Sequence, residues 1–129
     1  MPIYLTSEFD AERKRFRITG KKLCKAAELV RNGSHDGHLG RNVYKKRIGV
    51  PGSGASDGAR SIVFFDNGEY LYFFDVYLKS ELSKKNGKEL EYDEIEVYCA
   101  LAKDFLNMTD AIRLKLIKDK ELIEVKCDE

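Results

Sequence analysis

The pattern of hydrophobic and polar positions in the N-terminal third predicts one short strand followed by two helices. The strand is the apolar segment PIYLT at residues 2–6. A helical pattern then begins at Ser7, the expected N-cap, and a second begins after Thr19, its own expected N-cap. The Asn-Gly pair at residues 32–33 is expected to end the second helix. The positions expected to face inward are Phe9, Phe16, Ile18, Leu23, Ala26, Ala27 and Val30.

The middle of the chain is rich in β-branched and aromatic residues and predicts three strands. They are expected at residues 41–50, 60–66 and 69–78, and the last two are joined by Asn67-Gly68, a two-residue hairpin signal. An antiparallel three-stranded meander follows from this order. The preceding segment SHDGHLG at residues 34–40 is expected to be a connecting loop.

The C-terminal third predicts a polar loop, two helices and a closing strand. The segment KSELSKKNGKELEYDE at residues 79–94 is expected to be the loop. A short helix is expected from the cap Thr109-Asp110 to about Ile117, before the strand ELIEV. The longer helix between them has an apolar face formed by Ile95, Val97, Tyr98, Leu101, Ala102, Phe105 and Leu106. Together these elements indicate a single α+β domain spanning residues 1–129, with two N-terminal helices packed on a mainly antiparallel sheet and further helices at the C-terminus.

The charged residues are distributed unevenly along the chain, and this distribution bears on which partners the protein binds. Residues 1–60 carry 13 Lys and Arg against six Asp and Glu, whereas residues 61–129 carry 10 against 16. Such a division is typical of one surface for a polyanion and another for a basic partner, although the charges can also mix when the chain folds. No apolar stretch approaches the roughly 20 residues of a membrane span, and the N-terminus lacks a signal-peptide pattern. We therefore expect a cytoplasmic protein without a membrane partner.

The residue types that bind metals or cofactors give no recognisable pattern. Cys24, Cys99 and Cys127 are widely spaced and odd in number, so we expect reduced thiols, with neither a disulfide framework nor a zinc site. His35 and His38 are assigned no role. The glycines at positions 52, 54 and 58 do not match a dinucleotide or P-loop motif, and a strand rather than a helix follows them. A hairpin loop without a bound cofactor is the expected outcome.

The chain resembles the RelE/HigB-like toxins of bacterial type II toxin–antitoxin modules, which belong to the RelE/ParE superfamily. The resemblance covers nearly the whole chain and is most specific in LGRNVYKKRIGVPGSGASDGARSIVFF at residues 39–65. It continues through FFDVYLKSE at residues 73–81 and LIEV at residues 122–125. It implies a RelE-like α+β fold and a cytoplasmic toxin that cleaves mRNA on the ribosome. It also implies an antitoxin that inhibits the toxin, is encoded by an adjacent gene and binds DNA.

The resemblance also implies a set of catalytic cations. RNA is cleaved without a metal when the 2′-hydroxyl attacks the adjacent phosphate, and Lys and Arg side chains on rigid strands stabilise the charge that develops there. The family pattern has two alternating cations on the strand after a tyrosine, and these match Lys45 and Arg47 on one face, with Lys46 on the other face as a further RNA contact. The remaining cations match Arg60 and Lys79.

The family also uses a tyrosine at the start of the C-terminal helix to stack on a base. Tyr92 and Tyr98 both lie near that position; Tyr92 is the predicted exposed residue, whereas Tyr98 falls on the apolar helical face.

Three features depart from the family pattern and keep a second function open. The glycine loop contains Asp57, whereas the family pattern has a lysine in this loop. Asp75 lies in the strand that leads to Lys79, and the segment ELEYDEIE is acidic. Each weakens attraction for RNA, which depends on summed phosphate contacts. The alternative is a binding protein of the same fold without nuclease activity, either a gyrase inhibitor of the ParE kind or an inactive toxin homologue.

Overall fold

The computed structural model describes residues 2–52, 58–78 and 92–127. Along the chain it contains β1 (Ile3–Thr6), α1 (Ser7–Arg15), α2 (Gly20–Arg31), β2 (Gly37–Gly40), β3 (Val43–Ile48), β4 (Ala59–Phe65), β5 (Leu71–Leu78), α4 (Tyr92–Leu106), α5 (Asp110–Lys118) and β6 (Leu122–Val125). Most of the loop expected at residues 79–94 lies outside the described residues. From Tyr92 onward that segment is already helical.

The strands form one six-stranded sheet in the order β2-β3-β4-β5-β1-β6. The prediction of a three-stranded meander was incomplete, because β2 pairs antiparallel with β3 and extends the meander to four strands. Residues 37–40 were expected to be part of a loop, since this short glycine-containing segment has no apolar alternation. Its backbone nevertheless completes the ladder of β3. At the other side β1 lies parallel to β5, and β6 closes the sheet antiparallel to β1.

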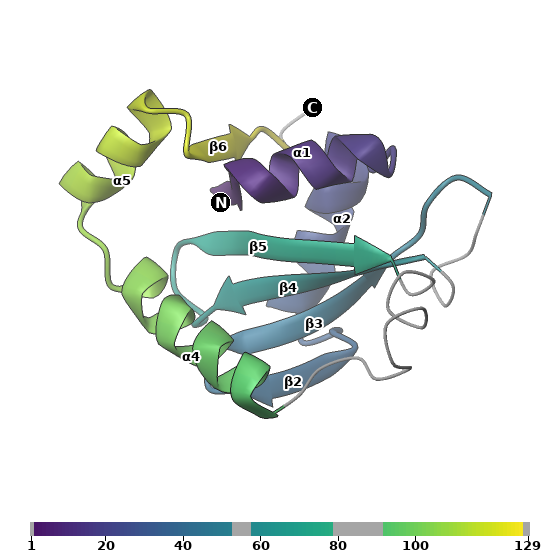
Figure 1. Cartoon of the computed structure of the whole chain (residues 1–129), viewed down its shortest axis with the longest axis horizontal. Coiled ribbons are helices and arrows are strands. Elements are labelled where there is room, and N and C mark those ends of the chain that lie inside the picture. The colour runs from purple at the N-terminus through teal and green to yellow at the C-terminus, as the bar shows by residue number, and fades with distance from the viewer. Residues whose placement is uncertain (1, 53–57, 79–91, 128–129) are drawn as a thin grey trace.

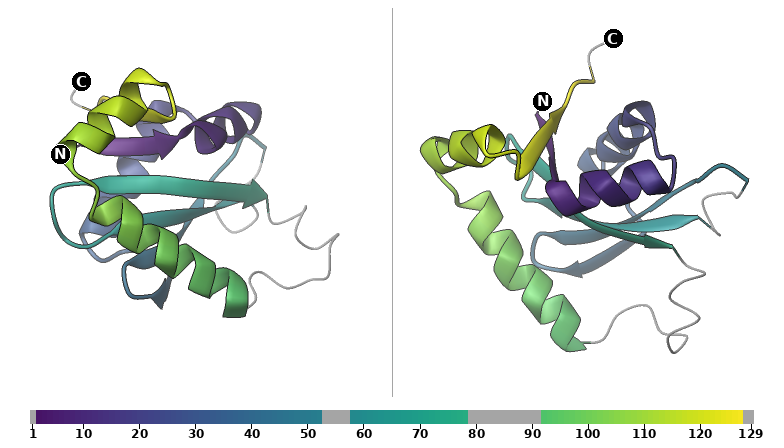
Figure 2. Two further views of the ribbon diagram at one scale, coloured as in Figure 1. Left: turned by 60° about the vertical axis from the view of Figure 1, so that its left-hand side comes forward. Right: turned by 45° about the horizontal axis from the view of Figure 1, so that its top comes forward.

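Each face of the sheet is covered by its own helices. α1 and α2 pack on one face, in a core that includes Phe9, Leu23 and Phe73. α4 and α5 contribute to the core on the opposite face, where Phe64, Tyr72 and Ala102 are buried. Figure 1 shows α4 in front of the sheet and α2 behind it, and Figure 2 shows the same layers from two further sides. The predicted inward positions of the first two helices are all buried.

Threonine caps fix where α1, α2 and α5 begin. Thr19 and Thr109 cap α2 and α5 as predicted. For α1 the cap is Thr6 rather than Ser7, because the Thr6 hydroxyl accepts a hydrogen bond from the Phe9 amide at 3.1 Å and donates one to the Phe74 carbonyl at 3.0 Å. The same side chain therefore begins α1 and ties it to β5.

The turn at Asn67-Gly68 is longer than the predicted two-residue hairpin. Phe65 pairs with Leu71, so five residues connect β4 and β5. Asn67 adopts a positive φ of 66°, and the Gly68 amide donates to the Asp66 carboxylate at 3.0 Å. Tyr70, the last residue of this connection, lies with its ring under the Arg113 guanidinium, 3.8 Å from the centroid.

The apolar face predicted for α4 includes one error. Val97 was expected to face inward, but it is 57% exposed, whereas Ala102 is buried and Tyr98 is half-buried. A helix buries only the stripe that contacts the sheet, and Val97 lies outside it. No helix among the described residues is both long and apolar enough to cross a membrane.

The expectation of three reduced thiols was wrong. Cys24 in α2 and Cys127 beyond β6 form a disulfide across a sequence separation of 103 residues, and Cys99 is the free thiol. Their spacing carries no sign of this pairing, since only the packing of α2 beside the C-terminal strand brings the two residues together. The described residues contain no group of three or more His, Cys, Asp or Glu side chains placed to hold a metal ion.

Candidate functional site: a cationic row on the sheet

The central strands bring three of the sequence-predicted cations onto one face of the sheet. Arg47 of β3 is paired with Arg60 of β4, and Lys45 is paired with Ile62. Side chains that lie opposite each other in a ladder share a face, and residues two apart on a strand do so as well. Ile62 belongs to the core under α4, so Lys45, Arg47 and Arg60 lie on the α4 face. The antiparallel pairing of β3 and β4 therefore places Arg60 beside the cations of β3, as the hairpin interpretation predicted.

The three cations differ in their access to solvent. Arg47 is exposed and Lys45 is half-buried, but Arg60 is only 2% exposed. The stem of Lys45 lies across Gly37 of β2, where a Cβ atom would come 3.4 Å from the Lys45 Cε atom. The Lys45 side chain thus packs against β2, a strand that the sequence pattern did not predict. In the described conformation Arg47 and Lys45 are the members of this row that an incoming phosphate can reach.

Lys46 lies on the opposite face, as the alternation predicted, because its strand neighbours Tyr44 and Ile48 pack in the core under α2. Its ammonium is 3.2 Å from Asp36, and the same carboxylate accepts the Arg47 backbone amide at 2.7 Å. Burial opposes ionisation of Asp36, but the Arg47 amide and the Lys46 ammonium outweigh it and lower the pKa of the carboxyl. Asp36 thereby fixes the backbone of β3 at Arg47.

Asp75, which the sequence marked as a departure from the family pattern, is held by a tyrosine of α4. It lies opposite Ile62 in the β4–β5 ladder, on the same face as the cationic row. The Tyr98 hydroxyl donates to its carboxylate at 2.8 Å, and the Val76 amide donates to the other oxygen at 2.9 Å. Burial raises the pKa of Tyr98, and the adjacent Asp75 carboxylate raises it further. Sequence reasoning placed Tyr98 in the apolar face and gave no signal for this bond.

Two predicted site residues cannot be placed within this geometry. Lys79 lies outside the described residues. Tyr92 is the first residue of α4, and its side chain lies outside the described part of the structure. Asp57, the other carboxylate singled out in the glycine loop, is also outside it.

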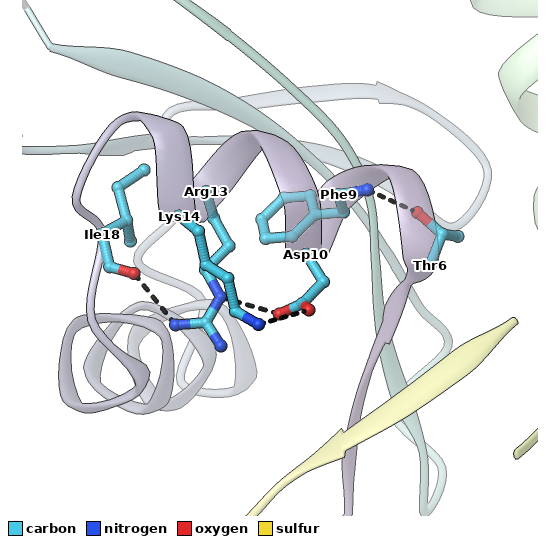
Figure 3. Close-up of polar contacts among 6 residues, drawn as sticks. All are labelled: Thr6, Phe9, Asp10, Arg13, Lys14 and Ile18. Carbon is cyan, nitrogen blue, oxygen red and sulfur yellow. Dashed lines mark hydrogen bonds and ion pairs between the residues drawn. The ribbon is translucent and has the colours of Figure 1, made fainter. Parts of the chain in front are cut away.

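A second cationic segment, ERKRFR at residues 12–17, covers the last turn of α1, and its helical cations are paired with carboxylates of the same helix. Figure 3 shows Arg13 and Lys14 converging on Asp10, at 2.9 Å and 3.2 Å. Arg13 also donates to the Ile18 carbonyl at 3.1 Å, which fixes the chain as it leaves α1. Arg15 pairs with Glu12 at 2.8 Å. These cations are therefore engaged in ion pairs within α1, and the row on β3 and β4 is the better candidate for an anion.

Comparison with models of known protein families identifies the family of this chain. Residues 1–125 match the family described as the RelE toxin of the RelE/RelB toxin–antitoxin system. The chain belongs to the RelE toxin family. Comparisons with curated proteins and with solved structures gave no match. Membership implies that this RelE-family toxin has an antitoxin partner, and the match spans all the strands that carry the cationic row.

Proposed function

We propose that this RelE-family toxin is a cytoplasmic, ribosome-dependent endoribonuclease that inhibits translation by cleaving mRNA. The observation that carries the proposal is the pairing of Arg47 with Arg60, next to Lys45, on one face of three hydrogen-bonded strands. Like charges placed directly opposite each other destabilise a sheet, so the pairing of Arg47 with Arg60 calls for a reason beyond folding. A phosphate that receives charge during cleavage is such a reason.

The row suits attack by a 2′-hydroxyl on the neighbouring phosphate, which leaves a cyclic phosphate and a 5′-hydroxyl. In this mechanism Arg47 binds phosphate oxygens through its guanidinium fork, and Lys45 adds a point charge beside it. Arg60 is buried, so it does not contact the phosphate in the described conformation. We assign it an indirect role, in which its charge strengthens the positive electrostatic field at the site from within the sheet. The strands hold these groups before the substrate arrives, which keeps the cost of reorganisation low.

The remaining site residues stay predictions of the same proposal. Lys79 supplies a fourth catalytic cation and Tyr92 stacks on a base. Lys46 binds RNA from the opposite face, in competition with its ion pair to Asp36.

A second candidate function rests on an acidic cavity that adjoins Asp75. It has a volume of about 400 Å³ and lies between α1, α4, α5 and β5. Its lining combines three carboxylate residues with apolar side chains. The lining residues are Thr6, Ser7, Glu8, Phe74, Asp75, Phe105, Leu116, Glu121 and Leu122. Such a cavity suits a protein segment with apolar and basic side chains better than RNA. It favours a RelE-fold binding protein, either a gyrase inhibitor or an inactive toxin homologue, as the alternative.

Purified ribosomes programmed with a defined mRNA separate the two functions. We expect the wild-type toxin to produce discrete mRNA fragments with 5′-hydroxyl ends, and Arg47→Ala to lose most of this activity. Lys118→Ala, an exposed cation on α5, is the matched control and should cleave like wild type. Intact mRNA with the wild-type protein, together with DNA-damage signalling in expressing cells, would instead support the gyrase-inhibitor alternative.

A further inference from the structure

The C-terminal end of the chain is attached to α2 by a single covalent bond. Cys127 lies two residues beyond the last residue of β6, and its sulfur is bonded to that of Cys24 in the middle of α2. Cys127 is exposed and Cys24 is half-buried, so a small thiol or disulfide in solution reaches the Cys127 sulfur first.

The two ends of β6 are anchored in different ways. At its start, Leu122 is buried in the core, and the Glu121 carbonyl next to it accepts the Ser7 amide at 3.1 Å. At its end, Val125 pairs with Ile3 of β1 and is only half-buried. β6 is the outermost strand of the sheet on this side, so β1 is its one neighbour in the ladder. The disulfide is therefore the strongest restraint on the C-terminal end of the strand.

A cavity of about 480 Å³ lies beside the disulfide, between α2 and the sheet. Both cysteines line it, together with the apolar side chains of Ile3, Ala27 and Phe65 and with polar residues of α2 and of the β4–β5 turn. If the bond opens and the tail moves away, one wall of this cavity is lost and its apolar lining becomes more accessible. The redox state of two sulfur atoms is thus linked to the exposure of apolar surface.

We propose that Cys24 and Cys127 form a reversible redox modification site whose reactant is a small-molecule disulfide of the glutathione class. The Cys127 thiolate attacks one sulfur of glutathione disulfide, forms a mixed disulfide and releases one glutathione thiolate. The Cys24 thiolate then attacks the Cys127 sulfur and releases the second glutathione thiolate. Two protein thiols lose two protons and two electrons, and one glutathione disulfide becomes two glutathione molecules. Excess thiol drives the same steps in reverse.

Disulfides in reducing compartments are mostly transient and redox-sensing, which is the setting that the proposed cytoplasmic location supplies. That part of the inference rests on the proposed function, whereas the bond and its effect on β6 do not. In the reduced protein the C-terminal end of β6 opens more often, because the pairing of Val125 with Ile3 has lost its tether. In the oxidised protein the strand stays closed.

The test compares full-length protein equilibrated with glutathione disulfide and with excess dithiothreitol. Intact mass should show the loss of two hydrogens on oxidation in wild type and in Cys99→Ser, but not in Cys24→Ser. Amide hydrogen exchange in residues 121–127 should be roughly tenfold faster in the reduced protein, while α4 is unchanged. Cys127→Ser, at an exposed position, reproduces the reduced state if Cys24→Ser fails to fold.

Two results would overturn the proposal. One is a wild-type chain that keeps all its thiols at equilibrium with glutathione disulfide, and the other is equal exchange in residues 121–127 of the two redox states. Neither measurement uses ribosomes or RNA. Failure here is therefore distinct from failure of the nuclease proposal, which only the cleavage assay addresses.

Discussion

Arg47 lies directly opposite Arg60 in the β3–β4 ladder, yet one side chain is exposed and the other is only 2% exposed. The two residues therefore contribute differently to the molecule. Arg47 belongs to the solvent-exposed surface, where the proposed function places the RNA, and Arg60 belongs to the interior of the fold. Substitutions at the two positions should separate activity from stability.

Arg47→Gln is expected to leave the free energy of unfolding unchanged or to raise it by a few tenths of a kcal/mol, because it removes one of two opposed like charges. It should reduce mRNA cleavage by roughly a hundredfold, the usual cost of losing one preorganised group that stabilises transition-state charge. Urea unfolding and the ribosome cleavage assay give the two values. A variant that cleaves like wild type would remove Arg47 from the site.

Arg60→Gln is expected to lower the free energy of unfolding by about 1–3 kcal/mol, because it alters a charged side chain that is almost completely buried. Cleavage should also fall when compared at equal amounts of folded protein. Urea unfolding measured beside Arg47→Gln provides the comparison. Equal stability of Arg60→Gln and wild type would show that burial of the guanidinium contributes little to folding.

Tyr98→Phe removes the hydroxyl that binds Asp75, and we expect a loss of about 1–2 kcal/mol in the free energy of unfolding at neutral pH. The raised pKa of Tyr98 also makes this contribution pH-dependent. Burial and the Asp75 carboxylate hold the proton in the folded state, whereas the unfolded tyrosine releases it near its ordinary pKa of 10.0. The stabilisation is therefore complete below pH 10 and falls as the pH rises above it.

Denaturant unfolding between pH 8 and pH 11 tests this sign. Wild type should lose stability above pH 10 more steeply than Tyr98→Phe. Some alkaline loss should remain in the variant, because burial also raises the pKa of Tyr4 and Tyr72. Parallel curves for the two proteins would show that Tyr98 does not retain its proton through folding.

Arg113 joins α5 to the sheet, and its replacement by Met should lower the free energy of unfolding by about 2–3 kcal/mol. The side chain is 5% exposed, donates to the Tyr72 hydroxyl at 2.9 Å and to the Met108 carbonyl at 3.3 Å, and pairs with Asp110. Lys115→Met is the matched control on the same helix, because its ion pair with Asp119 is exposed and should contribute less than about 0.5 kcal/mol. A similar loss in both variants would contradict a special role for Arg113.

Reduction of the disulfide should lower the free energy of unfolding by up to about 4.7 kcal/mol, the chain-entropy value for a closed loop of roughly 100 residues. Urea unfolding of the Cys99→Ser protein, with and without reductant, measures the difference. The Cys24→Ser protein should match the reduced sample and show no response to reductant. A reduced chain as stable as the oxidised one would mean that the unfolded state gains little freedom when the bond opens.

If the proposed function holds, the antitoxin partner inhibits the toxin either by covering the cationic row or by binding elsewhere and preventing entry to the ribosome. Direct cover predicts that Lys45→Ala/Arg47→Ala weakens antitoxin binding and reduces its salt dependence, because charge pairs have been removed. Binding measured at low and high salt, with Lys103→Ala/Lys118→Ala as control, distinguishes the modes. Unchanged affinity with the same salt dependence would place the antitoxin on another face.

The sequence by itself determined the local elements and the alternation of the cations. Helical spacing and β-rich segments predicted the N-terminal helices, β3 to β5 and the closing strand, and the caps Thr19 and Thr109 were predicted as well. The spacing of two residues between Lys45 and Arg47 fixed their common face, because this property depends only on strand geometry. The position of Arg60 directly after the glycine loop was likewise enough to predict that it lies near Lys45 and Arg47.

Only the tertiary structure decided what depends on contacts between distant segments. Residues 37–40 form a strand by pairing with β3, and Tyr70 in the β4–β5 turn packs under Arg113 of α5. Burial of Arg60, the bond from Tyr98 to Asp75 and the Cys24–Cys127 disulfide arise in the same way. Each of these features requires contact between two or more secondary-structure elements. The local periodicity of hydrophobic residues carries no information about such tertiary contacts.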